Sequence, residues 1–171
     1  MPHENAVWRL ARQIDAASKS ERFSVDAAAV GDLRRRGAAE LHSVCAEFVS
    51  SVNRNLSESA IELSPAGYSP ETFRESGVNI MQISSQGRQV QITVAAGAQL
   101  LSTEKFRMPY VLEGEVRAYN QKMLERFEIV TYSLFYCVAE EVFGWRFYDW
   151  RTLRTGPVNQ EFLVELMEAV F

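Results

Sequence analysis

The spacing of apolar residues divides the chain into a helical N-terminal part and a strand-rich remainder. In residues 24–56, apolar side chains recur at steps of three and four, which predicts one long amphipathic helix. Its stripe contains Val30, Leu33, Gly37, Leu41, Val44, Phe48 and Val52. Because glycine lowers helix propensity by about 1 kcal/mol, Gly37 marks either a close approach of another backbone or a tolerated defect.

Shorter segments with helical spacing of apolar residues lie at both ends of the chain. Residues 1–23 are expected to form an N-terminal helix and a connection, and residues 157–171 a closing helix capped by Asn159. The apolar positions of the first helix are Val7, Leu10, Ile14 and Ala17. The pattern leaves open whether this first helix packs on its own chain or on a second one.

From Val78 onward the apolar period changes from 3.6 to two, which predicts antiparallel strands over residues 78–153. One strand is expected to send Tyr110, Leu112, Gly114, Val116 and Ala118 to the same face. Residues 127–138 are apolar on both faces, so this strand should be central and covered on both sides. Residues 102–108 and 120–125 are expected to connect strands.

The segment from Trp145 to Arg151 is predicted to be the last strand, with Thr155, Gly156 and Pro157 ending it. Residues 57–77 read as a loop-rich crossing from the long helix into the sheet. Together these patterns predict a single α+β domain over residues 1–171. Five or six long, curved strands form an antiparallel meander on the long helix, and a short C-terminal helix follows.

Composition narrows the functional classes. The chain has 171 residues and a formal net charge of −4, which argues against a general nucleic-acid binder, because such proteins need basic residues to neutralise phosphates. Cys45 and Cys137 lie in apolar surroundings and are expected to be buried free thiols. The sequence has no 18-residue apolar run, and its first residues show no basic stretch followed by an apolar core, so we expect neither a membrane span nor a secretory signal. We therefore expect a soluble cytoplasmic protein that does not bind membranes.

The sequence offers little material for catalysis or metal binding. His42 and Cys45 stand one helical turn apart, but no cluster of Cys or His completes a tetrahedral site. Phosphate-binding glycine loops, nucleophile elbows, zinc motifs and dinucleotide fingerprints do not occur. We accordingly expect no metal, no cofactor and no catalytic residues.

One segment combines aromatic rings with guanidinium groups, which suits a planar or anionic ligand, a single-stranded nucleic acid or a protein partner. These candidate binding residues are Trp145, Arg146, Tyr148, Trp150, Arg151 and Arg154. The alternative is structural, with the aromatic rings filling the core and the arginines stacked on them.

A second set of polar residues lies on the predicted sheet. Glu113, Glu115 and Arg117 share one face, either as paired charges on a solvated surface or as groups for acid–base chemistry. If a pocket lies between the curved sheet and the helices, these three residues together with Tyr132 and Tyr136 are its candidate lining.

The function predicted from these features is a non-enzymatic protein-interaction module that self-associates as a homodimer. The supporting features are the second apolar face of residues 127–138 and the amphipathic helices. The alternative is a small-molecule-binding protein or an enzyme with a pocket between sheet and helices. A third interpretation is nucleic-acid binding through the Trp- and Arg-rich strand.

Overall fold

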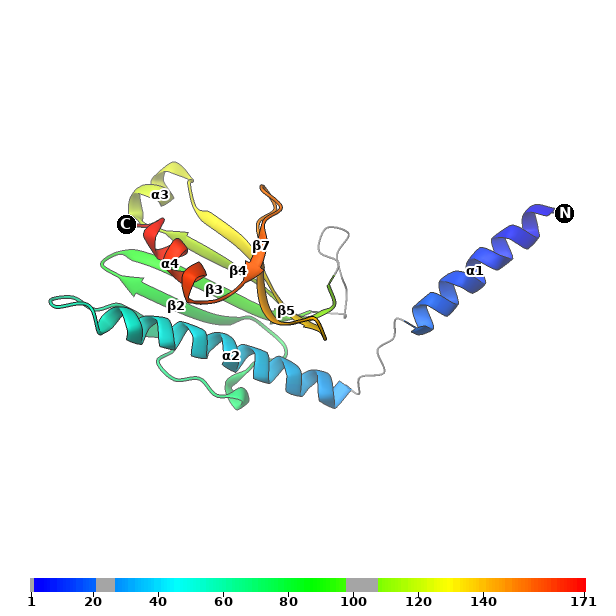
Figure 1. Ribbon diagram of the computed structural model, residues 1–171, viewed down its shortest axis with the longest axis horizontal. Helices are drawn as coiled ribbons and strands as arrows, with labels where there is room; N and C mark the ends of the chain where they lie inside the picture. The colour runs from blue at the N-terminus through cyan, green and yellow to red at the C-terminus, as the bar shows by residue number, and fades with distance from the viewer. Residues whose placement is uncertain (1, 21–26, 98–107) are drawn as a thin grey trace. The chain divides into compact units, whose positions relative to one another are not determined.

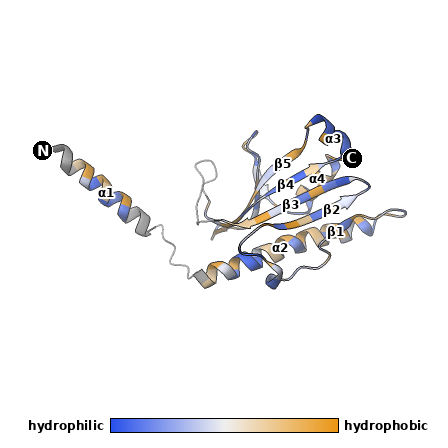
Figure 2. Cartoon of the chain, turned by 180° about the vertical axis from the view of Figure 1, so that it is seen from behind, coloured by the Kyte–Doolittle hydropathy of each residue, from blue (hydrophilic) through white to orange (hydrophobic). Residues whose placement is uncertain are grey.

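The computed structural model describes residues 2–20, 27–97 and 108–171. The chain separates into two compact units, residues 1–30 and 31–171, and each is described by itself. The first contains the helix α1 (Pro2–Ser20), in which apolar and polar positions alternate, as the orange and blue segments in Figure 2 show. The second contains a sheet with all but the first four residues of the helix α2 (Ala27–Asn53) alongside it (Figure 1).

The sheet is an antiparallel meander, in which each strand pairs with the next along the chain. Its strands are β1 (Glu62–Ser64), β2 (Asn79–Ser85), β3 (Arg88–Ala96), β4 (Tyr110–Tyr119), β5 (Val130–Ala139), β6 (Val142–Tyr148) and β7 (Thr155–Pro157). The predicted α+β class and the antiparallel sheet on a long helix are confirmed. The described sheet has seven strands, however, because short edge strands extend it at both sides.

The predicted last strand was wrong in its bounds. β6 ends at Tyr148, and Trp150 and Arg151 lie in the loop that follows. Asp149 ends the strand because its carboxylate accepts hydrogen bonds from the Arg151 backbone and the Thr152 hydroxyl, which closes a turn. The predicted strand breaker, residues 155–157, instead pairs with β6 as β7.

One of the two predicted connections between strands contains a short helix. The turn expected at residues 120–125 contains a short helix, α3 (Gln121–Arg126), because the Asn120 side chain accepts a hydrogen bond from the Met123 backbone and caps it. Farther upstream, the 3-10 turn η1 (Pro70–Thr72) has proline at its start, as such turns favour. The connection expected at residues 102–108 lies outside the described residues except for Met108.

One face of the sheet, called the inner face here, packs on α2 and on α4 (Gln160–Glu168). The Gly37 carbonyl of α2 accepts a hydrogen bond of 2.6 Å from the Trp145 indole, and the Tyr136 hydroxyl donates to Glu40 at 2.9 Å. On α4, the Phe162 ring stacks on Phe147 with centroids 4.3 Å apart. These contacts place the main core between the inner face and two helices.

The opposite face, called the outer face here, carries a second buried cluster. It contains Tyr110, Phe135, Cys137 and Tyr148, with Met108 packed against it. The expectation that the strand over residues 127–138 is apolar on both faces is therefore confirmed for the part of β5 from Leu134 to Cys137, which is buried throughout. Tyr110 and Phe135 of this cluster also line the candidate site.

Candidate functional site

The aromatic and cationic residues predicted as one binding group are divided between the two faces of the sheet. Trp145 lies on the inner face, 5% exposed, and bonds the α2 backbone. Its neighbours in sequence, Arg146 and Tyr148, lie on the outer face because Arg146 pairs with Phe135 and Tyr148 with Ser133. These residues therefore form no single platform of the kind that a single-stranded nucleic acid would need.

The two arginines that follow also have separate surroundings. Arg154 holds the Glu165 carboxylate of α4 through two hydrogen bonds of 2.8 and 2.6 Å, and its guanidinium lies 5.3 Å from the centroid of the Phe147 ring. This pairing lowers the pKa of Glu165. Arg151 is exposed in the β6–β7 loop. Arg154 thus fastens α4 to the sheet, whereas Arg151 remains open to a ligand.

A β-bulge in β4 brings Tyr110 to the outer face. Tyr110 pairs with Cys137 and Leu112 with Tyr136, so Val111 is an extra residue that reverses the alternation. The expectation that Tyr110 shares a face with Leu112 was therefore wrong. Arg34 of α2 holds the bulge, since its Nε donates to the Val111 carbonyl at 3.0 Å. The sequence signal was the run of three apolar residues at 110–112, which breaks the period of two.

Tyr110 becomes part of a pocket of about 410 Å³ on the outer face. This outer-face pocket is lined by Val78, Thr93, Val94, Ala95, Tyr110, Glu113, Gly114, Glu115, Ser133, Phe135 and Trp150. Most of the lining is apolar or aromatic. Its volume falls within the range of small-molecule sites, roughly 300–1,000 Å³. The outer-face pocket is therefore the candidate site for a small ligand.

Three aromatic side chains define the shape of the outer-face pocket. The Tyr110 and Phe135 rings lie with centroids 4.8 Å apart, and both side chains are buried. Trp150 arrives from the β6–β7 loop, packs edge-on against Tyr148 at 4.5 Å and donates a hydrogen bond to the Ser133 hydroxyl. Trp150 is 41% exposed, so it forms a rim of the pocket that a ligand can reach.

The charged groups of the pocket are carboxylates. Glu115 forms an ion pair with Arg117, which stands two residues farther along β4. Glu113 is exposed, and the Tyr110 hydroxyl lies 3.5 Å from its carboxylate. Burial and the neighbouring Glu113 raise the pKa of Tyr110, so its phenol is neutral at physiological pH. Among the residues that the structure describes, the lining contains no Lys, Arg or His.

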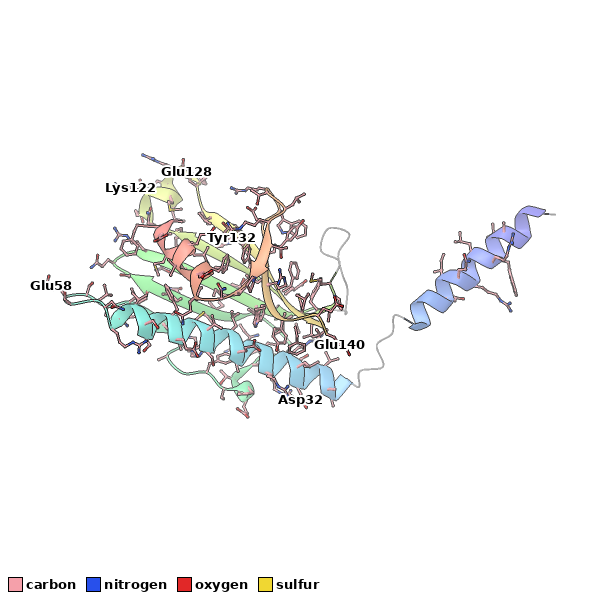
Figure 3. All side chains as sticks on the ribbon, in the orientation of Figure 1. Asp32, Glu58, Lys122, Glu128, Tyr132 and Glu140 are labelled. Atoms are coloured by element: carbon pink, nitrogen blue, oxygen red, sulfur yellow. The ribbon has the colours of Figure 1, made fainter. Side chains whose placement is uncertain are left out.

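Tyr132 and Tyr136, the other predicted pocket residues, belong to the inner face. Tyr132 lies beside α4 (Figure 3), where its ring meets Phe162 edge-on at 5.4 Å. Tyr136 is fully buried against α2, and burial together with Glu40 raises its pKa. Of the five residues predicted to line one pocket, Glu113 and Glu115 line the outer-face pocket, Arg117 pairs with Glu115, and the two tyrosines lie on the opposite face.

The helix α1 presents a second surface for binding. Within its own unit, Val7, Leu10 and Ile14 are each more than half exposed, and so is Trp8. The Arg12 guanidinium lies 4.5 Å from the centroid of the Trp8 ring and shields part of it. Within this unit the apolar stripe of α1 is therefore exposed.

His42 and the two thiols have structural surroundings. The Nε2 atom of His42 lies 2.7 Å from the Pro65 carbonyl oxygen, and its ring stacks on Tyr68. Burial raises the pKa of Cys45 to about 12 and that of Cys137 to about 11, so both are thiols at neutral pH. Within residues 2–20, 27–97 and 108–171, no three His, Cys, Asp or Glu side chains come together as metal ligands would.

A membrane-spanning helix must be both long and apolar. In the part of the chain that the structure describes, no helix combines the length and apolar character that a membrane-spanning helix requires. Comparison with known proteins finds no family model that matches the chain, and no curated protein or solved structure matches it significantly. The function is therefore inferred from the geometry of this chain.

Proposed function

We propose that the chain is a non-enzymatic protein-interaction module that self-associates as a homodimer through α1. The observation that carries this proposal is the open apolar stripe of Val7, Leu10 and Ile14. Their spacing of three and then four residues is that of a heptad seam. A β-branched residue stands at each a position and leucine at d, the combination that favours parallel two-stranded coiled coils.

The expected strength of this association is modest. Burial of one Val, Leu or Ile side chain contributes about 1.5–3 kcal/mol, and two helices bring three such residues each. Association costs about 4–15 kcal/mol in lost freedom, and a helix of 19 residues is only marginally stable by itself. Within the wide range that these terms allow, we expect a reversible dimer with a Kd of roughly 10 μM to 1 mM.

Light scattering on the full chain after size exclusion tests this proposal. Across concentrations up to about 1 mM, the mass is expected to rise from that of a 19.4 kDa monomer toward twice that value. Ile14→Glu places a charge in the seam and should return the mass to monomer. Arg12→Glu is the matched control, because it introduces the same residue on the opposite side of α1 and should leave the dimer intact.

A monomer mass over the whole concentration range would end the proposal. So would a dimer that Ile14→Glu leaves unchanged, since another surface would then hold the two copies. The two free, buried cysteines fit a reducing compartment, and we propose that the module acts in the cytoplasm.

A second candidate function, small-molecule binding, is favoured by one specific observation, the outer-face pocket with its aromatic walls. Binding there does not require α1. The two functions are therefore separable by substitution.

A further inference from the structure

The outer-face pocket has the shape of a site for a small molecule with an apolar body. Its volume of about 410 Å³ exceeds that of a benzene ring with a short side chain, and its lining includes Tyr110, Phe135 and Trp150. Val78 and Ala95 add aliphatic surface on the side of β3. Rigid aromatic walls bury large apolar area while losing little conformational freedom.

The carboxylates of the pocket determine which charge a ligand with an apolar body should carry. Glu115 is balanced by Arg117, whereas the part of the chain that the structure describes shows no ion pair for Glu113. On the same face, Phe135 stands between Glu113 and Arg146, which lies two strands away from that carboxylate. A ligand cation is therefore favoured at the Glu113 side of the pocket, where the nearer charge is negative and would repel an anion.

The β-bulge in β4 brings an aromatic residue and a carboxylate together at the Glu113 side of the pocket. It turns Tyr110 toward Glu113 and places an aromatic ring beside a carboxylate, which is the pairing that proteins use to hold organic cations. The phenol of Tyr110 stays neutral beside Glu113, so it adds a hydrogen-bonding group and no further charge. Arg34 fixes the bulge from α2 and does not line the pocket.

We propose that the outer-face pocket binds a small organic cation: an aromatic or aliphatic body against Tyr110, Phe135 and Trp150, with an ammonium group at Glu113. The proposal does not depend on self-association through α1. The chemical class is that of arylalkylamines and related monoamines.

Three probes of one size test the class on the full chain: 2-phenylethylamine, 2-phenylethanol and 3-phenylpropionate, which are cationic, neutral and anionic at pH 7. Binding is measured by calorimetry and by the NMR signal of the Trp150 indole N–H, which Trp150→Phe assigns. A ligand of this size is expected to bind with a Kd of about 1–10 mM. The amine should bind about threefold to tenfold more tightly than the alcohol and shift the Trp150 signal.

Two substitutions locate the ammonium group. Glu113→Gln keeps the shape of the side chain and removes its charge, and should weaken the amine about threefold to tenfold without affecting the alcohol. Glu62→Gln is the matched control, an exposed glutamate on β1 outside the pocket lining, and should leave both unchanged.

The proposal is overturned by either of two results. The first is that the amine shows no saturable binding up to roughly 20 mM, well above the expected Kd. The second is that the amine binds no more tightly than the alcohol, or equally well to Glu113→Gln. Circular dichroism of each variant establishes that it is folded before either result is read.

Discussion

Gly37 of α2 is the residue at which a single methyl group should have the clearest effect on the fold. A Cβ atom there would lie 2.7–2.9 Å from three atoms of the Tyr136 ring. That ring cannot move aside easily, because Tyr136 is fully buried, its hydroxyl bonds Glu40, and Trp145 packs against it at 5.4 Å.

The magnitude follows from three terms. Alanine in place of glycine should stabilise the helix by about 1 kcal/mol. Overpacking a buried site costs about 1–3 kcal/mol, and displacement of the ring would also weaken the hydrogen bond to Glu40, which contributes about 1 kcal/mol. We therefore expect Gly37→Ala to lower the free energy of unfolding by about 1–3 kcal/mol.

Guanidinium denaturation followed by circular dichroism measures this change. Gly31→Ala is the matched control in the same helix, because a Cβ there would approach only the Arg35 guanidinium, at 3.5 Å or more. The control should stabilise the protein by about 0.5–1 kcal/mol. If Gly37→Ala stabilises the protein as much as Gly31→Ala does, the close contact between α2 and Tyr136 is refuted.

Three further substitutions or conditions probe the parts around the site. Asn79 is buried, and its side-chain amide forms hydrogen bonds with the backbone of two neighbouring segments. Asn79→Ala should therefore lower the free energy of unfolding by about 1–3 kcal/mol in denaturant titrations. A change below about 0.5 kcal/mol would contradict that role. Arg34→Met removes the donor that holds the bulge and should cost about 2–4 kcal/mol; retained stability would show that the bulge needs no support from α2. Burial raises the pKa values of Cys45 and Cys137 from 9.0 to about 12 and 11, so the stability they contribute is complete below pH 9 and lost as pH rises through 11 and 12. Between pH 9 and 10, below the range in which the buried tyrosines also lose stability, unfolding titrations should show a loss of about 1 kcal/mol per thiol. A double substitution by alanine should remove this part of the loss; an unchanged slope in that variant would exclude the thiols as its cause.

Much of the fold could be predicted from the sequence because two periods separate clearly. The three-and-four spacing through Leu41 and Phe48 located α2, and the period of two located the main strands. The edge strand β7 was not predicted, since three residues carry too little pattern to distinguish a strand from a loop. For Gly37 the sequence left open either a close approach of another backbone or a tolerated defect. The structure shows a close approach, but the group in contact is the aromatic ring of Tyr136 and not a backbone.

The candidate site could be predicted only in part. Glu113 and Glu115 were identified because alternation places them together on one face. Tyr110 was assigned to the wrong face, since a bulge of one residue reverses every side chain on one side of it. The Trp- and Arg-rich segment was assigned one surface because β6 was expected to continue to Arg151; the Asp149 turn divides it instead.

Disulfide trapping tests self-association through α1 most directly. In a parallel pair of helices, Val7 of one copy faces Val7 of the other, so the full chain with Val7→Cys should form an interchain disulfide in a glutathione buffer. Arg12→Cys, on the opposite side of α1, should cross-link at least about tenfold more slowly. The native thiols do not compete, because Cys45 and Cys137 are buried. Equal cross-linking of both variants, or none with Val7→Cys, would contradict a parallel dimer through α1.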